Sequence, residues 1–220
     1  MKLLAVAVAA VALLAASAAI AANPHNPKKV ILPAVQAKAK AINVQLSDLP
    51  AAAGWKAKPP APDQGNPRCS YYDPDQSDLT ENADANSPEF TLASSSFVSS
   101  NTSIFKSARQ GRTAYARVVR PKLPLCLAEV FRKGSGQPKN VTIVSSAARR
   151  FPPLADRSNA YRIVADFKTG KTKVRIYLDV VVMNRGKVDA VVFFAGIGGS
   201  FSDSFEHRVT AKVAARTKNA

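Results

Sequence analysis

The chain has 220 residues, of which 46% are hydrophobic, and it carries a formal net charge of +16. This length suits one large domain, or one domain with a tail. The basic residues concentrate in residues 106–220, where 23 Lys and Arg accompany seven acids. Nucleic acid is not expected as a partner, because the aromatic residues lie among apolar ones rather than between arginines in loops.

Residues 1–22 have the pattern of a secretory signal peptide. Met1-Lys2 gives a positive start, an apolar run follows, and Ala19-Ile20-Ala21 supplies the small residues of a cleavage site. The alternative is an uncleaved anchor, since the run approaches the roughly 20 residues that a membrane span needs. We expect cleavage, which leaves a secreted or cell-envelope protein without a transmembrane helix. No cysteine follows the apolar run, so lipid anchoring through a cysteine there is excluded.

Two cysteines occur, Cys69 and Cys126, and both lie in the exported part. In an oxidising compartment a single pair most simply forms a disulfide. Closing a loop of that length stabilises a fold by roughly 4 kcal/mol in the chain-entropy view. Two free thiols or a metal pair are the alternatives, and neither has supporting His or Cys neighbours.

The exported part begins with a proline-containing entry segment, residues 23–32, which we expect to be flexible. Pro33 then opens a first helix, because apolar residues recur on one face as far as Leu46. Ser47 to Pro50 ends this helix, and a proline-rich connector runs on to Cys69. We expect residues 33–220 to form a single α+β domain.

The middle of the chain predicts one strand and two helices. Loose alternation of apolar residues indicates a strand over residues 89–98. Helical spacing over residues 103–119 predicts a helix with Arg109, Arg112 and Arg117 on its wet side. A short helix over residues 125–131 should stop near Gly134.

The C-terminal part predicts a meander. A strand is expected over residues 141–145, and alternation is clearest in residues 161–167, 174–182 and 188–194. Short glycine-bearing connectors separate the last three runs, which is typical of antiparallel hairpins. A final helix should follow, with Asp203 and Glu206 as its capping pair. Together these elements predict an antiparallel sheet flanked by helices.

Residues 69–86 form an acidic stretch within this basic chain, with Asp73, Asp75, Asp78, Glu81 and Asp84. A calcium loop counted from Asp73 would place Asp78 where the sharp turn needs glycine, and Asp84 where a longer Glu is preferred. We therefore interpret the stretch as a solvated connector of turns beside the disulfide, in which side chains bond their own backbone.

No catalytic, cofactor or metal set is predicted. His25 and His207 have no partners at ligand spacing, and neither H-E-x-x-H nor G-x-S-x-G occurs. The run Gly196-Ile-Gly198-Gly199-Ser200 superficially resembles a phosphate loop, yet it lacks the lysine and fits a strand-to-helix turn better. The residues proposed for contact with anionic surfaces are arginines: Arg109, Arg112, Arg117, Arg149 and Arg150.

Three short stretches resemble a known family. They are Asp48-Leu49-Pro50 with Gly54-Trp55, then Cys69 with Ser77 to Thr80 and Phe90, then Leu123 to Ala128 around Cys126. Together they are similar to actinobacterial exported proteins, namely mycobacterial LpqN-like lipoproteins and, more distantly, the extracellular sensor domains of serine/threonine kinases. The resemblance spans about residues 33–217 and implies a PsbP-like α/β/α sandwich with a binding or sensing role. The lipid-anchoring cysteine and the kinase part of those families are missing here.

These observations lead to three hypotheses in order of preference. The first is an exported, non-enzymatic binding or sensor-like domain with an unknown ligand or envelope component as partner. The second is a basic envelope-associated protein that binds anionic polymer or lipid. A secreted hydrolase comes third.

Overall fold

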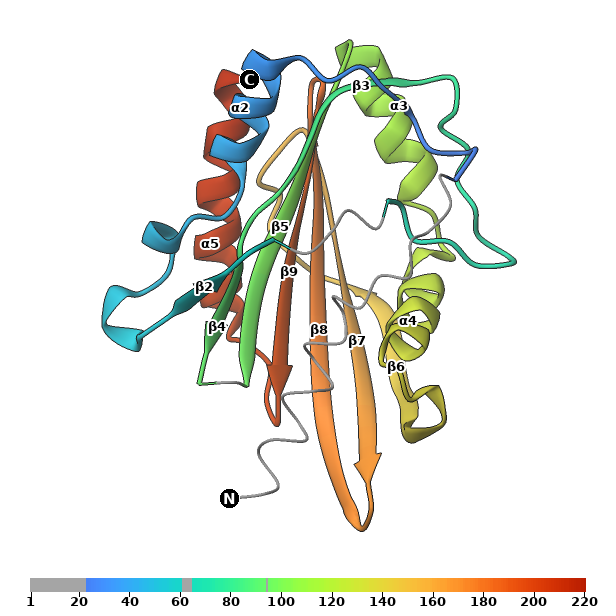
Figure 1. The fold of residues 1–220 in the computed structure, drawn as a ribbon, viewed down its shortest axis with the longest axis vertical. Helices are drawn as coiled ribbons and strands as arrows, with labels where there is room; N and C mark the ends of the chain where they lie inside the picture. Colours follow the sequence, from blue (N-terminus) through green and yellow to red (C-terminus); the bar gives the residue numbers. More distant parts are fainter. Residues whose placement is uncertain (1–22, 61–64, 94) are drawn as a thin grey trace.

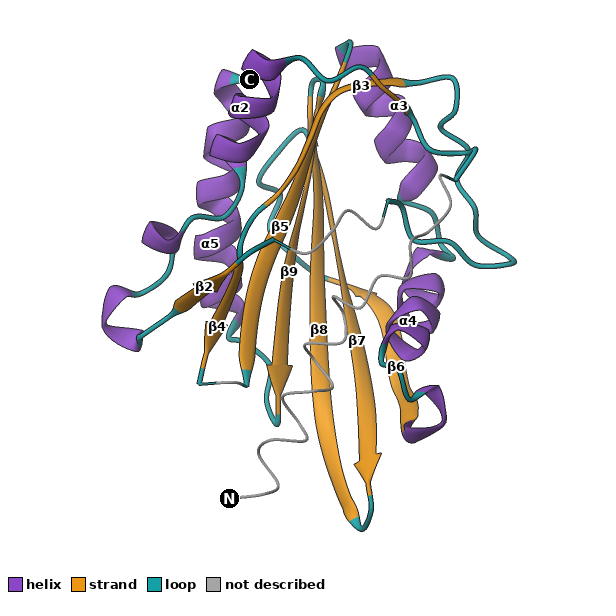
Figure 2. Cartoon of the chain, viewed as in Figure 1, coloured by secondary structure: helices purple, strands orange, loops and turns teal. Residues whose placement is uncertain are grey.

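The computed structural model describes residues 23–60, 65–93 and 95–220. The expected signal peptide, residues 1–22, lies outside the described residues. Within them the chain is mixed α+β, with nine strands in one mostly antiparallel sheet packed by four helices (Figure 1, Figure 2). The expected fold class is therefore confirmed.

The sheet has the strand order β1-β3-β5-β9-β8-β7-β6, with β4 beside β5 and β2 beside β4. The strands are β1 (Lys28–Lys29), β2 (Lys56–Lys58), β3 (Thr80–Asn86), β4 (Glu89–Leu92), β5 (Ser96–Phe105), β6 (Val141–Arg149), β7 (Arg157–Thr169), β8 (Thr172–Arg185) and β9 (Val188–Ile197). The helices are α2 (Pro33–Ile42), α3 (Ala108–Val118), α4 (Leu123–Gly134) and α5 (Asp203–Arg216). Short 3-10 turns are η2 (Leu46–Asp48), η3 (Ala51–Ala53), η4 (Pro138–Asn140) and η5 (Thr217–Asn219).

The expected meander is confirmed. Strands β6 to β9 pair antiparallel in chain order, with Ile163 opposite Leu178 and Val182 opposite Val191. The turn between β7 and β8 uses Gly170 at a φ of 59°, a left-handed conformation that glycine adopts without strain. Most of β8 is buried, so side chains on both of its faces need a covering layer.

Two helical layers cover the two faces. Helices α2 and α5 lie together on one face, and α3 and α4 lie on the other (Figure 1). The first layer buries Val209 and Val213 of α5. The second buries Tyr115 of α3 and Leu123 of α4. The sheet is thus the middle layer of a three-layer sandwich.

The structure of residues 69–86 contradicts the interpretation of this acidic stretch as a connector of turns. Its second half is strand β3, which pairs with β5, and Glu81 within it is only 4% exposed. Ala83 and Ala85 point into the α2/α5 core, while acids and amides occupy the alternate positions. Strand propensity misses such a segment, because Asn, Asp and Ala are poor strand formers and packing decides instead.

The strand expected at residues 89–98 and the helix expected at 103–119 also need correction. The first is divided into β4 and the start of β5, with a turn between them, and β5 continues to Phe105. Residues 103–105 are therefore strand, and α3 begins only at Ala108, where the hydroxyl of Ser107 accepts the Gln110 backbone N–H. An N-cap serine after the strand explains this later start.

Three further details differ from the expectations. The first helix ends at Ile42 and not at Leu46, which begins the 3-10 turn η2. The entry segment 23–32 contributes β1, which lies parallel to β3 through Lys28 and Lys29; its flexibility stays a prediction. The cap of α5 is Ser202, whose hydroxyl accepts the Phe205 N–H, and not the pair of Asp203 and Glu206. Glu206 is instead fully buried against the sheet and is bound by an arginine.

Cys69 and Cys126 form the expected disulfide. Cys126 is fully buried on α4, and Cys69 belongs to a small turn in which it exchanges backbone hydrogen bonds with Tyr72. The Tyr72 hydroxyl donates to the Val118 carbonyl at the end of α3. The disulfide therefore joins the segment before β3 to the α3/α4 layer.

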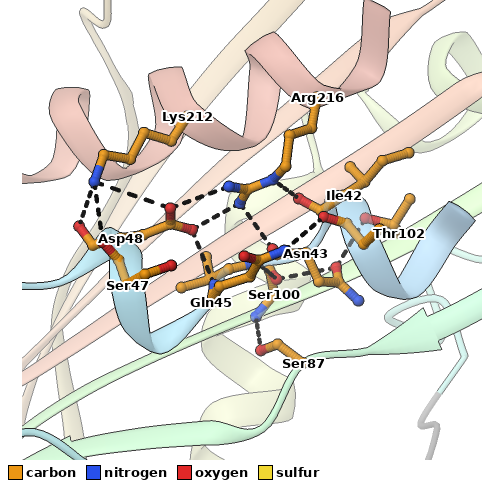
Figure 3. A network of polar contacts seen from close by, with 12 residues as sticks. Ile42, Asn43, Gln45, Ser47, Asp48, Ser87, Ser100, Thr102, Lys212 and Arg216 are labelled. Atoms are coloured by element: carbon orange, nitrogen blue, oxygen red, sulfur yellow. Dashed lines mark hydrogen bonds and ion pairs between the residues drawn. The ribbon is translucent and has the colours of Figure 1, made fainter. Parts of the chain in front are cut away.

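A polar clamp ties α5 to the segment after α2 (Figure 3). The guanidinium of Arg216 binds the buried carboxylate of Asp48 at 2.7 and 3.0 Å and also donates to the carbonyls of Ile42 and Asn43. The Asn43 side-chain oxygen accepts from Thr102 at 2.8 Å and from a serine of the same strand, Ser100, at 3.0 Å. The clamp thus connects helix, turn and strand β5 in one network.

We expect the double variant Cys69→Ala, Cys126→Ala to lose about 4 kcal/mol of unfolding free energy, because its unfolded chain is no longer closed into a long loop. Urea unfolding followed by circular dichroism measures this loss. Reductant should lower the parent to the level of the variant and leave the variant unchanged. Equal midpoints for oxidised parent and variant would contradict the stabilising role.

We expect Arg216→Ala to lose about 3 kcal/mol, because it leaves the buried Asp48 carboxylate without its bidentate partner. Lys212 lies 4.0 Å from that carboxylate and can compensate only in part. The control is Lys218→Ala, an exposed cation two positions further on. Urea midpoints that shift equally in the two variants would show that the clamp contributes nothing.

Candidate functional site

The sheet face below α3 and α4 changes from polar to apolar along the strands. Residues directly opposite each other on paired strands share a face. The row nearest the start of α3 is polar throughout: Asp84, Ser103, Asp189, Asn184 and Arg157. The next row is mixed: Asn86, Asn101, Val191, Val182 and Asn159. The third row is mostly apolar: Ser99, Phe193, Val180 and Tyr161.

The helices cover this face unequally. Helix α4 packs on β6 and β7, and α3 crosses the β5, β8 and β9 end of the sheet. Part of the face over β9, β5 and β3 therefore lies beside the helices rather than beneath them (Figure 1). Val191 and Phe193, which point to this side, remain half-buried.

A groove of about 250 Å³ lies over this part of the sheet. Its floor is apolar: Val180, Val182, Val191 and Phe193. The helices add an apolar wall: Val118, Leu123 and Leu127. The strands β3 and β5 add a polar wall: Glu81, Asp84, Asn86, Ser99, Asn101 and Ser103. Residues 26–27 and 65–67 close one side. We call this cavity the sheet groove.

The polar wall is partly organised by its own hydrogen bonds. The Asn101 amide donates to Asp84 at 2.8 Å and to Asn86 at 2.9 Å, and Lys29 binds the other Asp84 oxygen at 2.6 Å. The hydroxyls of Ser99 and Ser103 make no side-chain hydrogen bond to the residues that the structure describes. This wall can therefore position a polar group of a ligand through hydroxyl groups.

A carboxyl group lies at the polar end of this face. The Asn184 amide donates to Asp189 at 2.7 Å, and the Asn184 carbonyl oxygen is buried without a partner among the described residues. Burial, with a smaller effect from Glu81, raises the pKa of Asp189 from 3.8 to about 8, against the opposing effects of Asn184 and Arg157. Asp189 is therefore largely protonated near neutral pH and can donate a hydrogen bond.

The five arginines predicted to contact anionic surfaces are not brought together. Arg109 and Arg112 are exposed on α3, and Arg150 is exposed after β6. The Arg117 guanidinium binds the Asp78 carboxylate, which raises the pKa of this arginine. Arg149 lies on the opposite face, bound to Glu206 and Asp203 of α5 and to Asp179 of β8. Contact of these arginines with anions stays a prediction, and two of the five already have acidic partners.

The first half of the acidic stretch is held by ion pairs. Asp73 binds His25 at 2.9 Å and Arg68 at 3.0 Å. Asp75 accepts the Ser77 backbone N–H, the kind of local turn that was expected here. Within the described ranges no three His, Cys, Asp or Glu side chains are arranged to hold a metal ion.

The other motifs have structural roles. A Cβ on Gly196 would lie 2.1 Å from the Gly199 carbonyl, so the glycine run is a tight strand-to-helix turn. His207 packs against Phe151 at 6.2 Å between ring centroids. Among the described groove residues there is no histidine or cysteine. No helix in the described part of the chain combines the length and the apolar character needed to cross a membrane.

The sequence did not predict the sheet groove. The alternation that places its floor residues on one face was visible, but which part of the face stays open depends on where α3 and α4 pack. The one sequence signal was the serine and asparagine alternation in residues 99–103, on a strand that was expected to end at residue 98.

No protein-family model matches the chain, and no curated protein matches it. Two solved structures are similar in fold. One is the extracellular domain of PknH from Mycobacterium tuberculosis, with 11% identity and a TM-score of 0.43, over 83% of this chain and 96% of that one. The other is LpqN, involved in cell envelope biogenesis of the same organism, with 12% identity and a TM-score of 0.29, over 74% of this chain and 75% of that one. The similarity that the sequence motifs implied is thus found, as a distant one.

We expect Asp189→Asn to stabilise the fold at high pH and to change little at low pH. The fold favours protonated Asp189, so its stabilising contribution is complete below pH 3.8 and is lost as the pH rises through about 8. Half of that pKa difference already corresponds to a change on the order of 3 kcal/mol in the free energy of unfolding. Unfolding midpoints at a series of pH values from 4 to 9 measure the effect.

The control for this experiment is Asp156→Asn, at an exposed acid on the neighbouring turn. Its midpoints should follow the pH dependence of the parent. A constant offset between Asp189→Asn and the parent at every pH would contradict the assigned protonation.

Proposed function

We propose that this chain is an exported, non-catalytic binding domain that holds a small ligand in the sheet groove. The ligand has an apolar body, which packs on the floor at Val191 and Phe193, and a polar group that meets the hydroxyls of Ser99 and Ser103. The identity of the ligand stays open. Binding, rather than catalysis, is the role that this arrangement supports best.

The observation that carries the proposal is the contrast between the two sides of the groove. Apolar side chains on β8, β9 and α4 face hydroxyl and amide groups on β3 and β5. Mostly apolar pockets with a few convergent polar groups are the usual ligand sites of proteins. The volume of about 250 Å³ lies just below the usual range of such sites, roughly 300–1,000 Å³, and favours a compact ligand.

Export is supported independently of the groove. The disulfide between Cys69 and Cys126 is typical of proteins that mature outside the cytoplasm. The N-terminal sequence has the three parts of a secretory signal. Secretion or retention at the cell envelope would both satisfy these observations.

The test uses the neutral fluorophore N-phenyl-1-naphthylamine, whose emission rises in apolar surroundings. We expect saturable binding by the parent protein, and a decrease in affinity of about tenfold or more in Ser99→Trp, because an indole there would fill the floor beside Phe193. The matched control is Ser145→Trp on the exposed edge strand β6, which should bind like the parent.

Competition then addresses the ligand. A panel of small amphiphiles with neutral, cationic and anionic groups is titrated against the bound fluorophore. Displacement that disappears in Ser99→Trp assigns the competitor to the groove. A parent protein that binds no fluorophore, or equal binding by parent and Ser99→Trp, would overturn the proposal.

A further inference from the structure

The hairpin of β7 and β8 projects beyond the rest of the sheet (Figure 1). On one side, the pairing with β6 begins at Phe167, opposite Val141. On the other side, the pairing with β9 ends at Ile176, apart from one further bond from Gly198 N to the Arg175 carbonyl. Residues 168–175 therefore form a two-stranded ribbon, with no third strand beside it in the part of the chain that the structure describes.

This ribbon carries four cations and no acid: Lys168, Lys171, Lys173 and Arg175. Lys168 lies directly opposite Lys173, and like charges at such a position are unfavourable. The cost is only partly offset from within the chain. Asp166 binds Lys173 at 2.7 Å and Arg175 at 2.8 Å, and these two cations lower the pKa of its carboxyl to about 2.

Two of the ribbon cations have no acidic partner among the described residues and can therefore bind an anion of another molecule. Lys168 and Lys171 are exposed, and neither lies within ion-pair distance of an acid in the part of the chain that the structure describes. Lys139 on η4 adds to them, because Val141 shortly after it pairs with Phe167 at the base of the ribbon. Lys139 is likewise exposed and has no acidic partner among the described residues. Lys173 is also exposed, although it shares the single carboxylate of Asp166 with Arg175. We call Lys139, Lys168, Lys171 and Lys173 the basic tip.

The shape of the basic tip decides between anionic partners. A soluble polyanion is bound best along a groove or a track of cations, whereas these cations lie on the end of a projecting hairpin and on η4 near its base. Between the three ribbon lysines lie only Thr169, Gly170 and Thr172, so no large side chain separates their ammonium groups from a flat surface. No large apolar side chain stands at the turn, so contact would be electrostatic and without insertion.

From this geometry we propose that the basic tip docks the protein on a bilayer surface rich in anionic phospholipid headgroups. Each lysine near such a surface adds a modest attraction that salt screens. Several neighbouring lysines are therefore needed, and the ribbon supplies three of them while η4 supplies Lys139. The inference does not depend on a ligand in the sheet groove, which lies away from the ribbon.

The test is co-sedimentation of the purified exported protein with vesicles. One set contains phosphatidylcholine alone, and the other contains phosphatidylcholine with about 30% phosphatidylglycerol. We expect binding to the anionic vesicles at low salt, weaker binding at physiological salt, and little binding to neutral vesicles. Lys168→Glu, Lys171→Glu should weaken binding to the anionic vesicles by about tenfold or more.

The matched control is Lys38→Glu, Lys40→Glu, which changes the net charge equally on the exposed side of α2. It should retain most of the binding, and circular dichroism should show both variants folded. Equal losses in the two double variants would reduce the effect to net charge and overturn the proposal. Equal binding to neutral vesicles, no binding to anionic vesicles, or tighter binding to soluble polyphosphate than to vesicles would overturn it as well.

Discussion

The structure depends on the burial of strand β8 on both of its faces. Its side chains from Ile176 to Asn184 are almost all removed from water, and alternate ones point to opposite sides of the sheet. One helical layer cannot shield both sets, so the chain supplies α2 with α5 on one face and α3 with α4 on the other. The sheet groove follows from the same constraint. Because α4 packs on β6 and β7 and α3 crosses one end of the sheet, part of this face stays open over β9, β5 and β3.

Charged groups inside the sandwich explain how the α5 layer is held in place. Glu206 is fully buried, and Arg149 from the edge strand β6 reaches it across the sheet. At the other end of α5, Arg216 binds the buried Asp48. A buried ion pair contributes little net stability, yet removing one partner is costly, so such pairs oppose alternative packing of the helix. Ion pairs thus fix the positions of both ends of α5 on the sheet, while apolar contacts fix the position of its middle.

The same pairing redistributes the charge of this basic protein. Acids of the stretch before and within β3 are bound by cations, as Asp78 is by Arg117 and Asp84 is by Lys29. Arg117 and Arg149, which the sequence suggested as contacts for anionic surfaces, are instead paired with acids of the same chain. Among the described residues, the exposed cations without an acidic partner include Lys168 and Lys171 of the projecting ribbon, which extends beyond the ends of β6 and β9. Net charge alone could not have shown that location, because it depends on which strands end first.

The sequence by itself predicted export, and it determined the disulfide and the C-terminal meander that the structure contains. Each is a local or combinatorial property: a leader pattern, two cysteines that can pair in one way, and alternation with a period of two joined by short turns. The tertiary structure alone decided that residues 80–86 are a strand, since Asn and Asp have low strand propensity and only pairing with β5 and packing of Ala83 and Ala85 hold them extended. It also decided where the groove lies, because a groove is the space left by helices whose positions on the sheet are set by contacts between residues far apart in the chain.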